Sequence, residues 1–130
     1  MTTALIVDQL VIDAPAKVGL LAELTTALLG AGVTVTAIMG HDMAEGAEVV
    51  AMTDDNERAA EALTKAGVRV RLEPVVVMKM PDELGALNEA AQRIGDAGVN
   101  IHWVYATAPE SGHVRVVFST ADNEKVVGLF

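Results

Sequence analysis

Few side chains in this sequence could carry out catalysis or bind a metal, and their spacing builds neither kind of site. The chain has three histidines and no cysteines, which excludes disulfides, thiolate nucleophiles and cysteine-ligated metals. His102 and His113 are expected on neighbouring strands of one hairpin. A turn centred on Ser111 would pair His102 near Ser119, well away from His113, and His41 lies in another part of the chain. We therefore expect no metal site and no cofactor.

Other motif-like segments have simple structural explanations. Gly30-Ala31-Gly32 follows a predicted helix rather than a strand, and the third glycine of a dinucleotide fingerprint is missing. The sequence contains no nucleophile paired with a base and no phosphate-binding loop. Trp103 and Tyr105 alternate along a predicted strand, so they share one face, most simply for packing. We expect that the chain is not an enzyme.

Composition narrows the class of protein further. Hydrophobic residues make up 52% of the 130 residues and aromatic residues only 3%, which predicts a folded protein with an aliphatic core. Nine basic residues are outnumbered by eighteen acidic ones, so binding to nucleic acid or to an anionic membrane surface is not expected. The absence of cysteine is compatible with a reducing compartment, and Met1-Thr2-Thr3 lacks the basic region of a signal peptide. We expect a soluble, cytoplasmic protein.

An internal repeat organises the chain. Aligning Pro15 with Pro81 gives an offset of 66 residues (81 − 15), and the same offset continues to match without a gap. The matches are Gly19 with Gly85, Leu21 with Leu87, Glu23 with Glu89, Ala31-Gly32-Val33 with Ala97-Gly98-Val99, Val50 with Val116 and Leu63 with Leu129. Because glycines, prolines and apolar positions agree together, the sequence indicates a duplication.

Each copy has the element order of a βαββαβ module. In the first copy, strands are predicted over 4–12, 33–39, 47–53 and 68–72, and helices over 18–29 and 57–66. In the second copy, strands are predicted over 74–80, 101–107 and 113–119, and a helix over 84–97. A last helix begins near Asp122 or Asn123, and a cap for the helix over 57–66 is expected among Asp54, Asp55 and Asn56.

The predicted fold class is therefore α+β, with two ferredoxin-like βαββαβ modules whose sheets are antiparallel. The modules are expected at residues 1–72 and 73–130. The second is truncated, because it has no counterpart of the strand over 68–72. This leaves either an exposed sheet edge or a place where a strand is borrowed. A homodimer is expected, since an apolar edge needs to be covered.

The repeated pattern resembles the ACT domain family, whose members are small amino-acid-sensing modules with this fold. Each copy has a strand, a turn with Pro, Gly-Leu-Leu or Gly-Ala-Leu opening a helix, and Ala-Gly-Val closing that helix. The segments are Asp13–Leu21 with Ala31–Val35, and Met80–Leu87 with Ala97–Ile101. The resemblance covers nearly the whole chain, as a tandem pair with no attached enzyme. The family's Gly-x-Asn-Ile pattern is complete at Gly98–Ile101, whereas Thr34 replaces its Asn in the first copy.

The resemblance also implies a ligand site, because ligands of the family lie between paired modules. They touch the turn of one module and the strand start of the other. The implied residues are Asp82, Glu83, Leu84 and Gly85 with Thr34, or Asp13, Ala14 and Pro15 with Asn100 beside Ile101. Backbone N–H groups at the turns would bind the ligand carboxylate, and Asn100, which donates and accepts, would orient it. The simpler alternatives are that Asn100 only suits the helix exit and that Asp13 and Asp82 are turn or capping residues.

The function that the resemblance implies is an amino-acid-binding regulatory protein that biases a partner or its own oligomeric state. The alternative is an interaction or dimerisation module that no longer binds a ligand. A weaker alternative is a small enzyme that uses His102 or His113.

Overall fold

The chain folds into two compact units. The computed structural model describes residues 1–130. One unit contains residues 8–73, and the other contains residues 74–130 together with residues 1–7. The expected module boundary at 72/73 lies one residue from the point where the chain passes between the units. The first seven residues differ from the expectation, because they group with the second unit.

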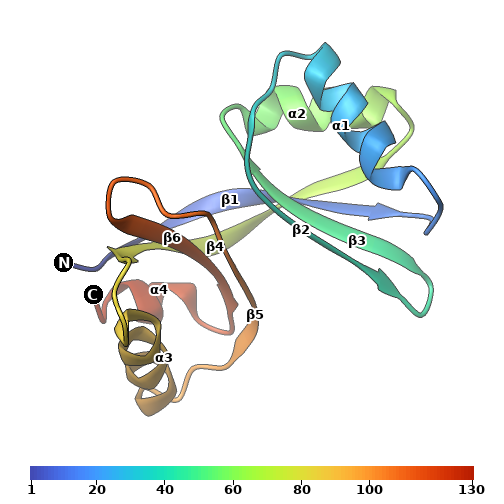
Figure 1. The fold of residues 1–130 in the computed structure, drawn as a ribbon. Helices are drawn as coiled ribbons and strands as arrows, with labels where there is room; N and C mark the ends of the chain where they lie inside the picture. Colours follow the sequence, from blue (N-terminus) through green and yellow to red (C-terminus); the bar gives the residue numbers. More distant parts are fainter. The chain divides into compact units, whose positions relative to one another are not determined.

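The order of elements follows the duplicated βαββαβ pattern (Figure 1). The elements are β1 (Thr3–Ala14), α1 (Leu20–Gly30), β2 (Val35–Met43), β3 (Gly46–Thr53), α2 (Asn56–Lys65), β4 (Arg69–Pro81), α3 (Ala86–Asp96), β5 (Ile101–Ala106), β6 (His113–Thr120) and α4 (Asn123–Val127). Hydrogen-bonded neighbours follow the strand order β2-β3-β1-β4-β6-β5. No helix is long and apolar enough to span a membrane.

In the unit of residues 8–73, α1 and α2 lie side by side on one face of the strands (Figure 1). β3 pairs antiparallel with both β1 and β2. Apolar residues at every second position of the strands and at every fourth position of the helices point into one core. This core contains Leu10, Ile12, Leu24, Leu28, Val33, Val49, Ala59 and Leu63. The sequence pattern and the observed core therefore agree.

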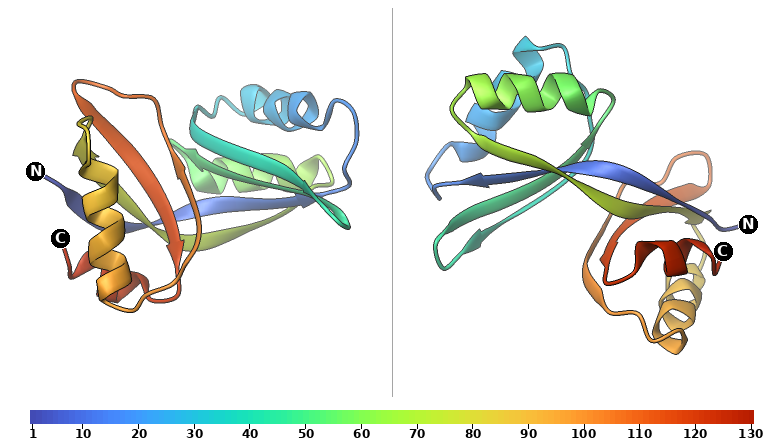
Figure 2. Two further views of the ribbon diagram at one scale, coloured as in Figure 1. Left: turned by 60° about the horizontal axis from the view of Figure 1, so that its bottom comes forward. Right: turned by 180° about the vertical axis from the view of Figure 1, so that it is seen from behind.

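The second unit has the same arrangement, with α3 and α4 on one face of its strands (Figure 2). β6 pairs antiparallel with β4 and β5. Its core contains Val76, Met78, Met80, Ala90, Ile94, Val99, Val116, Phe118 and Val126. α4 is only five residues long, and no strand follows it.

The beginning of β1 takes the place of the strand that the second copy lacks. β1 is the hydrogen-bonded neighbour of β4, and its first residues group with the second unit. Ala4 packs against the core of that unit. Of the two expected outcomes, an exposed edge or a borrowed strand, the second is confirmed.

Pro74 lies inside β4, whereas the sequence predicted two separate strands, over 68–72 and 74–80, with Pro74 as the first residue of the second. β4 is one continuous strand of 13 residues. Proline has no N–H to give to a sheet, and the pairing of β4 with β6 begins only at Val76. The Pro74 carbonyl accepts a hydrogen bond from the Asn123 side chain at 3.0 Å. Pro74 is therefore accommodated where no ladder bond to β6 is lost.

The gap-free alignment of the two copies is wrong in its last third. Ile12 pairs with Val49 in the first copy, and Met78 pairs with Val116 in the second. The offset is therefore 66 on one strand (78 − 12) but 67 on the other (116 − 49). The additional residue lies in the hairpin that joins β5 to β6, where an insertion disturbs no core contact. Val50 consequently corresponds to Val117.

A charge at Ala4 tests whether residues 1–7 are part of the second unit. We expect Ala4→Asp to lower the free energy of unfolding of this unit by about 2 kcal/mol, because it places a carboxylate against an apolar core. Trp103, the only tryptophan, is half-buried in β5, so its fluorescence reports urea unfolding of this unit.

Thr3→Asp is the matched control, because Thr3 is exposed on the same strand. Thr3→Asp should change the urea concentration at the midpoint of unfolding only slightly. Equal midpoints for Ala4→Asp and the unmodified protein would contradict the borrowed strand.

Candidate functional site

Each of the two turn-to-helix junctions ends in a glycine, whose backbone conformation is one that only a residue without a side chain adopts easily. Gly19 and Gly85 precede α1 and α3 with φ angles of 84° and 90°. Neither helix has a side-chain cap. The first N–H groups of both helices therefore lack a side-chain acceptor and carry the positive end of the helix dipole.

The second helix of each copy is different, because an aspartate caps it. The Asp55 carboxylate accepts from the Arg58 N–H, and the Asp122 carboxylate accepts from the Lys125 N–H, both at 3.1 Å. These two residues were among the capping candidates and are confirmed. The duplicated module thus satisfies one helix N-terminus internally and leaves the other open.

Asp13, the penultimate residue of β1, and Asp82, in the turn after β4, have no capping role. Neither carboxylate reaches its helix, and the Asp82 backbone N–H instead donates to the Gly112 carbonyl at 2.9 Å. The capping alternative for these two aspartates is therefore wrong. Their carboxylates remain available to bind a cation such as an ammonium group.

Both predicted turns line cavities that contain charges of both signs. Glu83, Leu84 and Gly85 line a cavity of about 570 Å³ that also includes Glu89 and Arg93. Asp13, Ala14 and Pro15 line a cavity of about 510 Å³, and its other charged residues are Glu45 and Arg69. A zwitterion requires this mixture, since its carboxylate needs donors and its ammonium group needs acceptors.

Sequence reasoning missed the arginines of these cavities. Arg69 begins β4, and Arg93 lies in the last turn of α3. Arg93 also donates to the Leu129 carbonyl and stacks on the Phe130 ring, 4.4 Å from its centroid. Because the two arginines come from non-equivalent elements, the repeat gave no signal for them.

A third cavity, of about 310 Å³, lies in the unit of residues 8–73 between α1 and the β2–β3 hairpin. Its lining is mainly apolar and includes Leu21 and Ile38, whose side chains are exposed. Gly40 also lines it, and a Cβ there would come within 3.2 Å of Val49 Cγ2. The sequence analysis did not single out this cavity.

The predicted strand starts lie far from the turns within each unit. β1 and β2 both pair antiparallel with β3, so β1 and β2 run parallel. Pro15 follows the end of β1, whereas Thr34 precedes the beginning of β2, at the opposite end of the sheet. The same holds for Gly85 and Asn100 in the second unit. Neither unit brings its own turn and strand start together.

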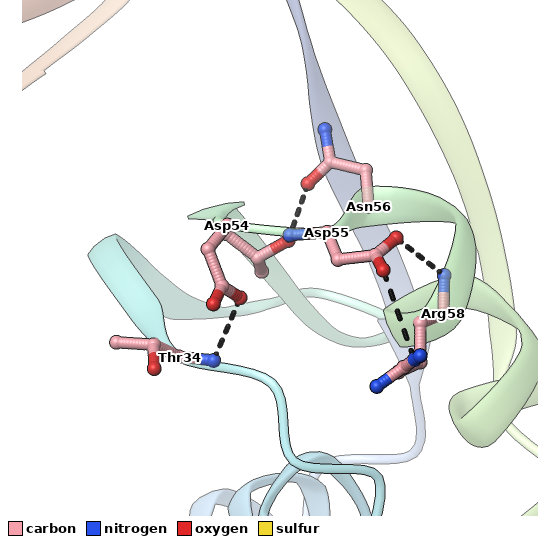
Figure 3. A network of polar contacts seen from close by, with 6 residues as sticks. Thr34, Asp54, Asp55, Asn56 and Arg58 are labelled. Carbon is pink, nitrogen blue, oxygen red and sulfur yellow. Dashed lines mark hydrogen bonds and ion pairs between the residues drawn. The ribbon is translucent and has the colours of Figure 1, made fainter.

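The environments of the two strand starts differ. The Thr34 N–H donates to Asp54 Oδ1 at 2.9 Å (Figure 3). Asn100 is exposed, and its side-chain Nδ2 lies 3.4 Å from His102 Nδ1. Ile101 is half-buried and packs against the core, so its side chain is not free to contact a ligand.

A four-residue motif, Thr-x-Asp-Asn, connects the start of the second helix of each copy to the first strand of that copy. Thr53 Oγ1 donates to Asn56 Oδ1 at 2.6 Å, and Asn56 Nδ2 donates to the Asp8 carbonyl at 2.9 Å. In the second copy, Thr120 and Asn123 make the same bond at 2.6 Å, and Asn123 continues to Pro74. Sequence reasoning missed the motif, although Thr53–Asn56 and Thr120–Asn123 repeat three of four residues.

The three histidines lie on three different strands and do not converge. The register places His102 at a bulge beside Ser119 and Thr120, as the hairpin predicted, while His113 pairs with Pro81 at the other end. His113 Nδ1 lies 3.1 Å from the Ser111 carbonyl. No cluster of three or more histidine, aspartate or glutamate side chains suits a metal ion.

Two βαββαβ copies, with one capped and one uncapped helix in each, define a duplicated ferredoxin-like module. A family model described as "ACT domain pair" matches residues 5–129, and the chain belongs to this family. The predicted resemblance is thus confirmed. A search of curated protein sequences found no match.

Solved structures share this fold. Protein BT0572 from Bacteroides thetaiotaomicron matches with a TM-score of 0.88 and 25% identity, over 97% of this chain and 87% of that one. The regulatory subunit of aspartate kinase from Thermus thermophilus, in its ligand-free form, matches with a TM-score of 0.68 and 18% identity, over 97% of this chain and 93% of that one. The aspartate kinase of Clostridium acetobutylicum matches with a TM-score of 0.62 and 16% identity, over 98% of this chain but only 32% of the enzyme.

Replacing the aspartates tests which of them hold the fold. We expect Asp122→Ala to lower the free energy of unfolding by about 1 kcal/mol, because α4 loses its cap. Asp82→Ala should change it by less than about 0.5 kcal/mol, since that carboxylate makes no hydrogen bond. Urea unfolding followed by Trp103 fluorescence measures both. A cost for Asp82→Ala as large as that for Asp122→Ala would show a structural role for the turn carboxylate.

Proposed function

We propose that this chain is an amino-acid-binding regulatory protein and not an enzyme. Its ligand lies between two ACT modules, touching the turn of one and the strand start of the other. The observation that carries the proposal is the pair of uncapped first helices, each beginning at a cavity with charges of both signs. α3 begins at the cavity lined by Glu83, Glu89 and Arg93, and α1 begins at the cavity lined by Lys17 and Asp42. Family membership supports the regulatory role.

The chemistry of a free amino acid matches these groups. One oxygen of its carboxylate accepts from the N–H groups at the helix start, and the other accepts from the Asn100 N–H. Its ammonium group is held by Asn100 Oδ1 and by the carboxylate of Asp13, or of Asp82 and Glu83 in the converse pairing. Because each module keeps its own turn and strand start at opposite ends, a ligand that touches both needs two modules.

A site shared by two modules couples ligand binding to their association, since each stabilises the other by the same free energy. We propose that the protein acts as a homodimer in the cytoplasm. Exposed apolar side chains flank the first helix and the edge strand of each unit and support self-association. They are Leu21 and Ile38 in one unit and Leu87 and Val104 in the other.

A thermal-shift panel against the twenty amino acids, confirmed by calorimetry, tests the proposal. A ligand at a hundred times its Kd stabilises the folded state by about 2.7 kcal/mol. For a protein of this size, the expected rise in Tm is about 10 °C. One or two amino acids should produce it, and Asn100→Ala should remove it.

Asn88→Ala is the matched control, because Asn88 is exposed on α3 and lines none of the cavities. It should keep the full shift. Folded, ligand-free protein that responds to none of the twenty would instead favour the interaction and dimerisation module.

A further inference from the structure

The two strand starts have the same backbone geometry, which makes their side chains directly comparable. Thr34 and Asn100 each follow Ala-Gly-Val, and each precedes a strand with a register shift after its first residue. The Thr34 carbonyl accepts from the Asp54 N–H at 3.1 Å, and the Asn100 carbonyl accepts from the Ala121 N–H at 3.0 Å. Asp54 and Ala121 are thus equivalent positions.

The difference between the copies is one carboxylate. Asp54 Oδ1 accepts from the Thr34 N–H at 2.9 Å, so this donor is occupied (Figure 3). Ala121 has no such group, and the exposed Asn100 N–H has no hydrogen-bond partner in the protein. The same backbone donor therefore binds a carboxylate in one copy and is open in the other.

Asp54 has no other structural task that explains its position. Asp55, not Asp54, caps α2, and Asp55 also forms the ion pair with Arg58, at 3.7 Å. The Asp54 side chain is exposed, and its one hydrogen bond is the one to Thr34. A carboxylate fixed on the same chain competes with a free carboxylate at a high effective concentration.

We propose that Asp54 closes the strand start of the first module by imitating the carboxylate of the ligand, and that Ala121 leaves the second module open. The chain then has one amino-acid site rather than two. The strand start that stays open is the one at Asn100, and the strand start at Thr34 is closed. This inference rests on the proposed function and determines its stoichiometry.

Exchanging the two side chains tests the inference. D54A removes the internal carboxylate, and A121D installs one beside Asn100. Both positions are exposed and both backbones are already in the required geometry, so both variants should fold. The probe is an equimolar mixture of the twenty L-amino acids, and the measurement is the backbone amide resonance of residues 34 and 100 in ¹⁵N-labelled protein.

We expect the mixture to move the resonance of residue 100, but not that of residue 34, in the unmodified protein. In D54A both should move, residue 34 more weakly because threonine lacks an amide. In A121D neither should move, since loss of a charge-assisted hydrogen bond weakens binding roughly tenfold to hundredfold. Amide exchange without the probe gives an independent check. Residue 34 should lose protection in D54A, and residue 100 should gain it in A121D.

Two results would overturn the inference while the proposed function stands. One is a response of residue 34 in the unmodified protein equal to that of residue 100. The other is an undiminished response of residue 100 in A121D, with the added carboxylate shown by amide exchange to occupy the N–H. If no resonance moves in any of the three folded proteins, the proposed function fails and the inference fails with it.

Discussion

The structure depends on each unit having a fourth strand beside its first. A βαββαβ module buries one sheet face under two helices, and a missing outer strand would expose both backbone groups and core side chains. In the unit that contains residues 74–130, this position beside β4 is taken by the beginning of β1. β1 and β4, with 12 and 13 residues, are about twice the usual strand length, and the residues of each divide between the two units. A cut between residues 72 and 73 would therefore remove Thr3–Val7 from the unit to which they belong.

A second constraint acts at the end of each sheet where the strand starts lie. The Asn56 and Asn123 side chains connect the second helix of their copy to a carbonyl of its first strand, and a threonine hydroxyl fixes each amide. Both copies therefore hold the neighbouring residue, Asp54 or Ala121, at the same distance from the strand start. With the scaffold held constant, the one altered side chain decides whether the backbone N–H is occupied.

Much of the fold could be predicted because the relevant signals are local. The type of each element follows from local signals with little help from tertiary contacts. These signals are alternating apolar residues in the strands, apolar residues spaced three or four positions apart in α1 and α3, and glycines at helix ends. The shift in offset from 66 to 67 gives no signal at Val50, because Val116 and Val117 are both valines and either matches it. The local signal of the shift was the repeat of Thr53–Asn56 in Thr120–Asn123, which was missed, and the strand register establishes it. The borrowed strand was predictable only as an alternative, since covering an edge is a requirement that many segments could meet.

The candidate site was likewise predictable only where its signals are local in the sequence. Its glycines and turns could be located, because positive φ and helix starts leave clear signals in one copy and again in the other. Asp54 was considered only as a possible helix cap, because Asp54, Asp55 and Asn56 are all capping residue types and local sequence does not rank them. Its contact with Thr34 joins residues 20 positions apart, which no local pattern reveals. Arg69 and Arg93 were missed because they reach the cavities from elements that do not correspond in the repeat.

The divergence of two otherwise equivalent positions has a consequence for how the protein would respond to its ligand. Two identical sites on one chain could bind cooperatively within that chain. One site per chain cannot, so a chain acting alone follows a simple hyperbolic binding curve. Cooperativity then requires coupling between chains, and the same coupling makes ligand affinity depend on assembly. Replacing Asp54 by a residue without a carboxylate would thus change more than the number of sites, because it would allow cooperativity within a single chain.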